Sequence, residues 1–385
     1  MADNSTFDPS NVDLDTVDPT EVICYLNAGG NEYNGQLGAR ISALFVILIV
    51  SSAATFFPVM ATRIKRFRIP LYVYLFARYF GAGVIVATAF IHLLDPAYGE
   101  IGPNTCVGMT GNWAEYSWPP AIAMASVMII FLLDFVAEWF VEAKYGSGAA
   151  RGNVEGLITT PSREEQLKAP GSRGTNEPRD VESADTANPT AYPQDNKLAE
   201  SDKVAYAEER DILSLSSEET QRAFQEQIAA FLVLEFGVIF HSVIIGLNLG
   251  VAGDEFATLY PVLVFHQSFE GLGIGARLSA IPFPEKLRWM PWALCTGYGL
   301  TTPIAIAIGL GLRTTYDGGS FTANVVSGVF DSISAGILIY TGLVELLARD
   351  FIFNPTLTRD KKRIIFMLVC LYLGAGVMAL LGKWA

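Results

Sequence analysis

Apolar runs of about 20 residues recur along this 385-residue chain, and they restrict its fold more than any other feature. A helix of that length crosses roughly 30 Å of hydrocarbon. We predict eight membrane-spanning helices, at residues 39–62, 72–95, 118–140, 225–252, 257–280, 289–313, 322–348 and 363–383. The expected fold class is therefore an all-α polytopic membrane protein.

The net charge of −13 is concentrated in two polar segments. Residues 1–36 carry seven acids and no Lys or Arg, and residues 145–222 carry fifteen acids and nine bases. Such segments bury too little apolar surface to fold alone. We divide the chain into an acidic N-terminal segment (1–38), helices 1–3 (39–140), a mostly disordered loop (141–224) and helices 4–8 (225–385). The acidic balance argues against nucleic acid as a partner.

Lys and Arg alternate between successive connections. The connection at 63–71 has four bases and no acid, whereas the connection at 96–117 has two acids and no base. By the positive-inside rule, both termini are extracellular and the loop at 141–224 is cytosolic. Three lysines of that loop are then available to the ubiquitin machinery, a hypothesis that rests on their exposure alone: Lys168, Lys197 and Lys203.

Four cysteines are present, and none forms a CxxC pair. A thiolate zinc cluster is therefore not indicated. Cys295 and Cys370 lie in apolar runs, which is typical of small packing residues. Cys24 and Cys106 lie in polar segments and are able to form a disulfide if both are outside the cell.

The three histidines of the chain all lie in predicted spans, and two of them share a sequence frame. His241 begins His-Ser-Val-Ile-Ile-Gly-Leu-Asn-Leu-Gly, and His266 begins His-Gln-Ser-Phe-Glu-Gly-Leu-Gly-Ile-Gly. Both read His-x4-Gly-Leu-x-[Leu/Ile]-Gly. Because the fourth and fifth spans run in opposite directions, the two copies are antiparallel. We expect them to face one another near the membrane centre.

This repeat indicates a metal site. His266 and Glu270 are four residues apart and share a helix face, and at 1.5 Å per residue they reach nearly the same depth as His241. Imidazole is a strong Zn²⁺ ligand, and a carboxylate at that depth is costly unless it is paired, protonated or metal-bound. We therefore predict His241, His266 and Glu270 as metal ligands, with Ser242 and Gln267 as weaker oxygen donors. The pattern is not HExxH, so the sequence predicts neither a zinc hydrolase nor a resident cofactor.

Other polar residues within the spans are candidates for a transport pathway, because polar side chains at such depth often line one. These candidates are His92, Asp95, Asp134, Asp331 and Glu345. His92 and Asp95 are expected at the outer end of the second span. Asp331 and Glu345 are expected on nearly the same helix face. The alternative is a set of structural salt bridges, for which Arg78 and Arg277 are available.

The two histidine motifs resemble those of the ZIP family of zinc- and iron-regulated metal transporters, and most of all its fungal plasma-membrane members. The resemblance rests on the segments that begin at Glu235 and His266, on Gly-Leu-Thr-Thr-Pro at 299–303 and on Phe-Asp-Ser-Ile-Ser-Ala-Gly at 330–336. It implies eight helices, with outer three-helix units in inverted symmetry around helices 4 and 5. It also implies import of Zn²⁺, sometimes Fe²⁺ or Mn²⁺, into the cytosol by alternating access.

Two positions depart from the family pattern for a two-metal centre. Ile245 and Thr302 stand where that pattern has acids, so we expect a single central ion. Two rival functions remain open: a metal-binding receptor without flux, and a proton-coupled carrier of an organic solute that uses the same His and Glu. A homodimer is also left open.

Overall fold

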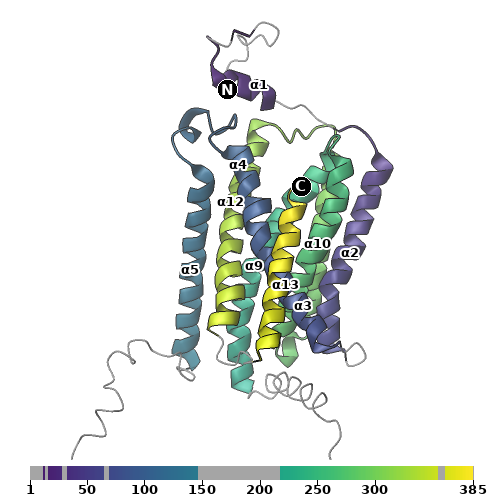
Figure 1. The fold of residues 1–385 in the computed structure, drawn as a ribbon, viewed down its shortest axis with the longest axis vertical. Coiled ribbons are helices and arrows are strands. Elements are labelled where there is room, and N and C mark those ends of the chain that lie inside the picture. Colours follow the sequence, from purple (N-terminus) through teal and green to yellow (C-terminus); the bar gives the residue numbers. More distant parts are fainter. Residues whose placement is uncertain are drawn as a thin grey trace, which may run out of the picture. The chain divides into compact units, whose positions relative to one another are not determined.

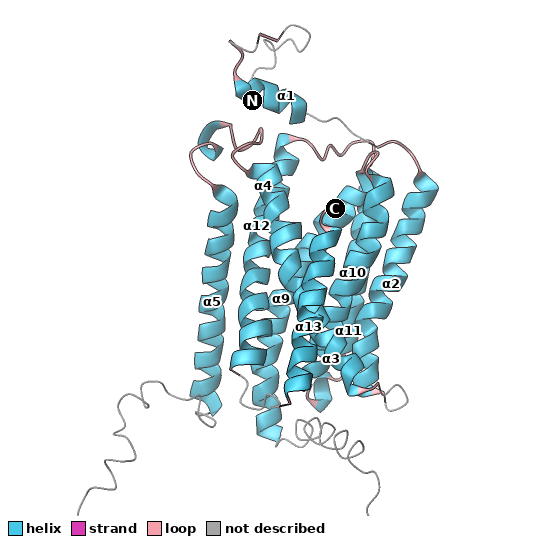
Figure 2. Cartoon of the chain, in the orientation of Figure 1, coloured by secondary structure: helices cyan, strands magenta, loops and turns pink. Residues whose placement is uncertain are grey.

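The computed structural model describes residues 12–13, 16–27, 33–64, 69–145, 217–353 and 360–384. These residues form helices joined by turns and loops, and no strand occurs among them (Figure 1, Figure 2). The chain divides into two units, Met1–Glu138 with Ser214–Ala385, and Trp139–Leu213. Every contact discussed below lies within the first unit. The second contributes only the last turns of α5 to the described residues.

Apart from α1, which lies in the N-terminal segment, the described helices follow the predicted spans. They are α1 (Pro19–Asn27), α2 (Leu37–Arg63), α3 (Leu71–Ala87), α4 (Asp95–Ile101), α5 (Trp118–Tyr145), α9 (Ser217–Val251), α10 (Phe256–Ala280), α11 (Met290–Leu312), α12 (Phe321–Tyr340) and α13 (Lys361–Leu381). A π-helical segment, η2 (Thr88–Leu94), joins α3 to α4, and a second one, η5 (Thr341–Ile352), continues α12. Short 3₁₀ turns are η3 (Gly111–Trp113) and η4 (Glu285–Leu287). The second and seventh spans therefore run beyond their predicted ends.

Seven helical segments in the described part of the chain are long and apolar enough to cross a membrane. They are Leu37–Arg63, Leu71–Ile101, Trp118–Phe140, Gln227–Val251, Glu285–Leu312, Phe321–Ile352 and Lys361–Leu381. The remaining predicted span coincides with α10, which is a helix but is less apolar because it carries His266, Gln267, Glu270 and Arg277. The loop predicted at 141–224 lies mostly outside the described residues.

This bundle buries several polar side chains within its hydrophobic core, and it exposes many large apolar side chains. α10 packs against α2, α3, α9, α11 and α13, so its polar residues are shielded by other helices (Figure 1). Large apolar side chains such as Phe45, Ile49, Leu132 and Phe135 are exposed instead. Buried polar groups and an apolar outer surface suit a lipid environment, because polar groups facing hydrocarbon are costly.

The glycines of the repeated frame set how closely the central helices approach their neighbours. A Cβ at Gly275 of α10 would lie 2.1 Å from the carbonyl oxygen of Thr55 in α2. A Cβ at Gly250 of α9 would lie 2.9 Å from backbone atoms of Gly309 in α11. The two copies therefore pack their glycines against different partners, α2 and α11, which brings helix backbones together as small residues do in membrane bundles.

Two tethers hold the polar connections at one end of these helices. Cys24 of α1 forms a disulfide with Cys106, with their Cα atoms 4.5 Å apart, which settles a pairing that the sequence left open. Arg40, which is fully buried in α2, donates hydrogen bonds to the carbonyl oxygens of Leu249, Gly250 and Ala252. These are carbonyls that the end of α9 cannot satisfy within the helix. Arg40 thus fixes the turn between α9 and α10 against α2.

Candidate metal centre

Two histidines from antiparallel helices meet in the interior of the bundle. His241 lies on α9 and His266 on α10, and each is about 1% exposed. Their Nε2 atoms are 3.3 Å apart, and their rings are tilted with respect to one another. The structure therefore brings together the two imidazoles that the repeated frame singled out.

Oxygen donors surround this pair. Glu270, one turn after His266, places its Oε2 atom 3.7 Å from the His266 Nε2 atom and is fully buried. The amide of Gln267 lies 3.5 Å from the Ser242 hydroxyl. Tyr298 of α11 reaches both Gln267 Oε1, at 3.0 Å, and Glu270 Oε2, at 3.4 Å. Tyr298 therefore orients the two oxygen-bearing side chains toward the histidines.

Asp331 and His92 flank the same cluster from opposite sides. Asp331 of α12 has its Oδ1 atom 3.9 Å from the Nδ1 atom of His241. The His92 ring stands edge-on to the His266 ring, with 4.8 Å between the centroids, and its Nε2 atom is 3.1 Å from the Met378 carbonyl oxygen.

His92 therefore lies beside the central cluster, and the helical segment continues from Leu94 to Ile101. The expected role of His92 at an outer mouth stays a prediction. Asp95, which was expected beside His92 in the outer mouth, is exposed on the surface of α4.

Several ligand atoms of this region are buried without a hydrogen-bond partner in the described part of the chain. They are Glu235 Oε2, His241 Nδ1, His266 Nδ1, Glu270 Oε1, Thr302 Oγ1 and Asp331 Oδ1. Buried polar atoms normally have partners, so such a group of orphans marks a place where a ligand is expected. No three His, Cys, Asp or Glu side chains among the described residues are already close enough to hold a metal ion. Binding therefore requires a small movement of at least one donor.

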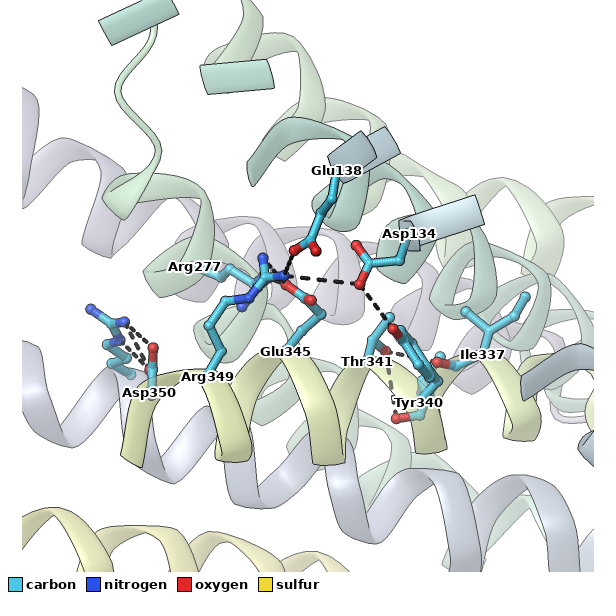
Figure 3. Close-up of polar contacts among 11 residues, drawn as sticks. Asp134, Glu138, Arg277, Ile337, Tyr340, Thr341, Glu345, Arg349 and Asp350 are labelled. Carbon is cyan, nitrogen blue, oxygen red and sulfur yellow. Dashed lines mark hydrogen bonds and ion pairs between the residues drawn. The ribbon is translucent and has the colours of Figure 1, made fainter. Parts of the chain in front are cut away.

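A second polar cluster lies further along α10 and η5 and contains two of the predicted pathway residues (Figure 3). Glu345 accepts a hydrogen bond from Arg277 at 3.2 Å and forms an ion pair with Arg349 at 2.9 Å. Arg349 also approaches Glu138 at 2.8 Å and Asp134 at 3.9 Å. We call these five residues the arginine cluster. Asp134 and Glu345 are thus held in ion pairs in this structure, as the salt-bridge alternative expected.

Neighbouring contacts extend the arginine cluster. The Tyr340 hydroxyl donates to Asp134 Oδ2 at 2.8 Å, and Arg78 of α3 binds Asp350 through both carboxylate oxygens (Figure 3). Arg277 is therefore the partner of a predicted acid, whereas Arg78 pairs with an acid beyond the predicted seventh span.

Comparison with known proteins agrees with this arrangement. The family model described as ZIP Zinc transporter matches residues 37–382. This chain belongs to that family. It is 57% identical to the zinc-regulated transporter 1 of Saccharomyces cerevisiae, over 98% of this chain and 97% of that protein. It is 40% identical to the zinc-regulated transporter 1 of Schizosaccharomyces pombe, over 92% and 88% of the two chains. No solved structure matches the chain.

The structure also places Ile245 and Thr302, the two positions that depart from the family pattern for a two-metal centre. Ile245 packs against an apolar cluster that includes Ala43, Ile47 and Leu249, and it brings no carboxylate one turn after His241. Thr302 is buried and presents only a neutral hydroxyl.

Sequence reasoning missed several polar residues of this ZIP chain, for two reasons. Arg349 and Asp350 lie just beyond the predicted end of the seventh span, and Glu100 lies beyond that of the second, so all three were assigned to loops. Tyr298 lies inside a predicted span, but nothing in its neighbourhood of the sequence marks it as polar and buried.

Proposed function

We propose that this chain imports Zn²⁺ into the cytosol through the cluster formed by His241, His266 and Glu270. The spacing of the two imidazoles supports the proposal most directly. Two nitrogens that each lie 2.0–2.1 Å from one tetrahedral Zn²⁺ are about 3.3 Å apart. The Nε2 atoms of His241 and His266 already have this separation.

The remaining ligands come from the same two helices. A shift of well under an ångström in Glu270, whose Oε2 atom is 3.7 Å from His266 Nε2, brings a carboxylate into tetrahedral range. Ser242 and Gln267 supply neutral oxygens for a fourth position. Because Ile245 and Thr302 carry no carboxylate, the site holds one ion and lacks the bridging acid that a second would need.

Ligand chemistry and family membership favour zinc over other divalent ions. Imidazole suits Zn²⁺ better than Mn²⁺, which prefers oxygen ligands. The relatives that match along nearly their whole length are named as zinc transporters. Fe²⁺ and Mn²⁺ are secondary substrates in this proposal. A receptor without flux is not favoured, because the family is one of transporters.

The proposed arrangement in the membrane has eight spanning helices, with α10 as the eighth and with α9 and α10 at the centre of a 3+2+3 inverted repeat. Both termini are extracellular and the membrane is the plasma membrane. The Cys24–Cys106 disulfide supports this orientation, because disulfides persist in oxidising compartments. A site that is about 1% exposed must open to each side in turn, which is alternating access. Homodimer formation and ubiquitin attachment at the predicted loop, which lies outside the described residues, complete the proposal.

Uptake of ⁶⁵Zn in zinc-starved cells that lack their own high-affinity uptake tests the proposal. His241→Ala and Glu270→Ala should each lower uptake efficiency by at least about 10–100-fold, since loss of a residue that only supports a metal ligand already costs that much. Glu255→Ala is the matched control, since Glu255 is an exposed acid beside the start of the same helix. Surface abundance of each variant is measured in parallel, and Fe²⁺ and Mn²⁺ are added as competitors.

Absence of ⁶⁵Zn uptake by the wild-type chain at normal surface abundance would overturn the proposal. So would normal uptake by His241→Ala or Glu270→Ala. Stronger inhibition by Fe²⁺ than by unlabelled Zn²⁺ would reverse the substrate preference.

A further inference from the structure

Buried polar atoms without a hydrogen-bond partner also occur beyond the two histidines. Beyond His241 the row of such atoms continues to Asp331 of α12 and then to Glu100 of α4, whose Oε2 atom also has no hydrogen-bond partner in the described part of the chain. Asp331 is 4% exposed, and its Oδ1 atom approaches His241 Nδ1 at 3.9 Å. Glu100 therefore extends the row from the central cluster toward the end of α4.

A close helix contact places Glu100 near Asp331. Gly328 of α12 has no side chain, and a Cβ built there would lie 2.7 Å from Ile101 and 3.2 Å from the Cβ atom of Glu100. Asp331 follows Gly328 by three residues, about 4.5 Å along the helix axis. The two carboxylates are near enough to interact electrostatically. Glu100 is thus a neighbour of Asp331, which in turn is a neighbour of His241.

The charges around these two acids differ from those around the arginine cluster. Glu345 and Asp134 are compensated by Arg277 and Arg349. Within the described residues, Glu100 and Asp331 form no ion pair with any Lys or Arg, and the imidazole of His241 is the basic side chain nearest to Asp331, at 3.9 Å. Burying a carboxylate without a partner is costly, and a neighbouring carboxylate raises that cost. A cation that binds between Glu100 and Asp331 removes both penalties.

One further group faces Glu100 from the segment after α11. Tyr316 lies within electrostatic range of Glu100, and burial together with the nearby carboxylates of Glu100 and Asp317 raises the pKa of its phenol. A neutral phenol supplies no positive charge to Glu100.

We propose that Glu100 and Asp331 form an outer capture site, at which the transported divalent cation binds before it reaches His241. The inference rests on the proposed import of zinc. The capture site has only oxygen ligands, so it holds a divalent ion less tightly and less selectively than the imidazoles do. Weak binding suits the capture site, because the ion must leave this site before it binds at His241 and His266. Selection of zinc then takes place at His241 and His266.

Uptake kinetics test the capture site. Glu100→Gln removes the charge with little change in shape, and it should raise the KM for ⁶⁵Zn about tenfold at nearly unchanged Vmax, because charged clefts concentrate ions by at least that factor. Asp331→Asn should act in the same direction. The double variant should raise KM less than the product of the single effects, because both acids serve one site. Glu115→Gln removes an exposed acid from the same connection and is the control.

A binding assay separates the capture site from flux. Glu100→Cys introduces the sole reactive thiol, since Cys295 and Cys370 are buried and Cys24 and Cys106 are bonded to one another. A membrane-impermeant thiol reagent should label this variant, and Zn²⁺ should slow the labelling. Addition of Asp331→Asn should abolish that protection.

The outcomes distinguish the two proposals. If the wild-type chain shows no uptake but Zn²⁺ still protects Glu100→Cys in an Asp331-dependent way, the import proposal fails and the capture site stands. If the wild-type chain imports zinc while Glu100→Gln keeps the wild-type KM, or while Zn²⁺ leaves labelling unchanged, the capture site is refuted and import stands.

Discussion

The Arg277–Glu345 pair should respond asymmetrically when either partner is neutralised. Glu345 is 1% exposed and is shared by two guanidinium groups, those of Arg277 and Arg349. Arg349 has further acids within reach at Glu138 and Asp134. Within the described residues, the only ion pair of Arg277 is with Glu345. Removal of Glu345 therefore leaves Arg277 with no ion pair, whereas removal of Arg277 leaves Glu345 paired.

Magnitudes follow from what each variant leaves behind. Glu345→Gln leaves a mostly buried guanidinium without its carboxylate, which costs about 3–5 kcal/mol. Arg277→Gln removes one charge-assisted hydrogen bond while Arg349 still compensates Glu345, which costs about 1.5–3 kcal/mol. The double variant Arg277→Met with Glu345→Leu buries no unpaired charge at either position. It should be less destabilised than Glu345→Gln alone.

Thermal unfolding in detergent, followed by fluorescence-detected size exclusion, measures these differences. The apparent midpoint should fall about twice as far for Glu345→Gln as for Arg277→Gln, because the shift is roughly proportional to the lost free energy. Glu285→Gln is the control: Glu285 pairs with Arg288 on the surface, with side chains 79% and 69% exposed, and such pairs contribute little. A larger shift for Arg277→Gln than for Glu345→Gln would refute the reasoning. So would a double variant whose shift equals the sum of the single ones.

Two further predictions use the same assay. Gly275→Ala should destabilise the chain by about 1–3 kcal/mol, because its Cβ would lie 2.1 Å from the Thr55 backbone. Gly297→Ala has open space around its Cβ and should be neutral or stabilising by up to about 1 kcal/mol. Equal effects of the two substitutions would contradict the close α10–α2 contact. Cys24→Ser and Cys106→Ser should each cost about 2–4 kcal/mol, and the double variant no more than either, since they break one bond. Non-reducing peptide mapping should find the linked fragment only in the wild-type chain.

The positions of the helices were predictable because length and apolarity alone determine them. Each of the eight predicted spans coincides with a helix, and α10 differs only in its lower apolarity. The approach of His241 to His266 was predictable for a similar reason: a fixed rise per residue and opposite chain directions give both side chains the same depth. These inferences need no knowledge of which helices touch.

The ends of the second and seventh spans were not predictable by the same reasoning. Both continue through π-helical segments, η2 and η5, and both extensions carry charged residues that lower local apolarity. A π-helix bonds each residue to the fifth one along rather than the fourth, so positions counted at 3.6 residues per turn lose their register. Asp331 and Glu345, which were expected on nearly the same helix face, have different partners: Asp331 lies near His241, and Glu345 pairs with Arg277. The ion-pair partners in η5 carry no signal in the sequence, because partner choice depends on which helices pack together.

Helix α10 carries two of the proposed zinc ligands, His266 and Glu270, as well as Arg277 of the arginine cluster, and this links ion binding to helix position. Arg277 follows Glu270 by seven residues, about 10.5 Å along α10. Glu345, its partner, lies on η5, a different element. A displacement of α10 that carries His266 and Glu270 relative to η5 must therefore stretch the Arg277–Glu345 bond. Because a hydrogen bond of 3.2 Å is lost within about one further ångström, the pair opposes even small movements of the site. Compensation of Glu345 by Arg349 lowers this resistance, since the carboxylate keeps a partner while α10 moves.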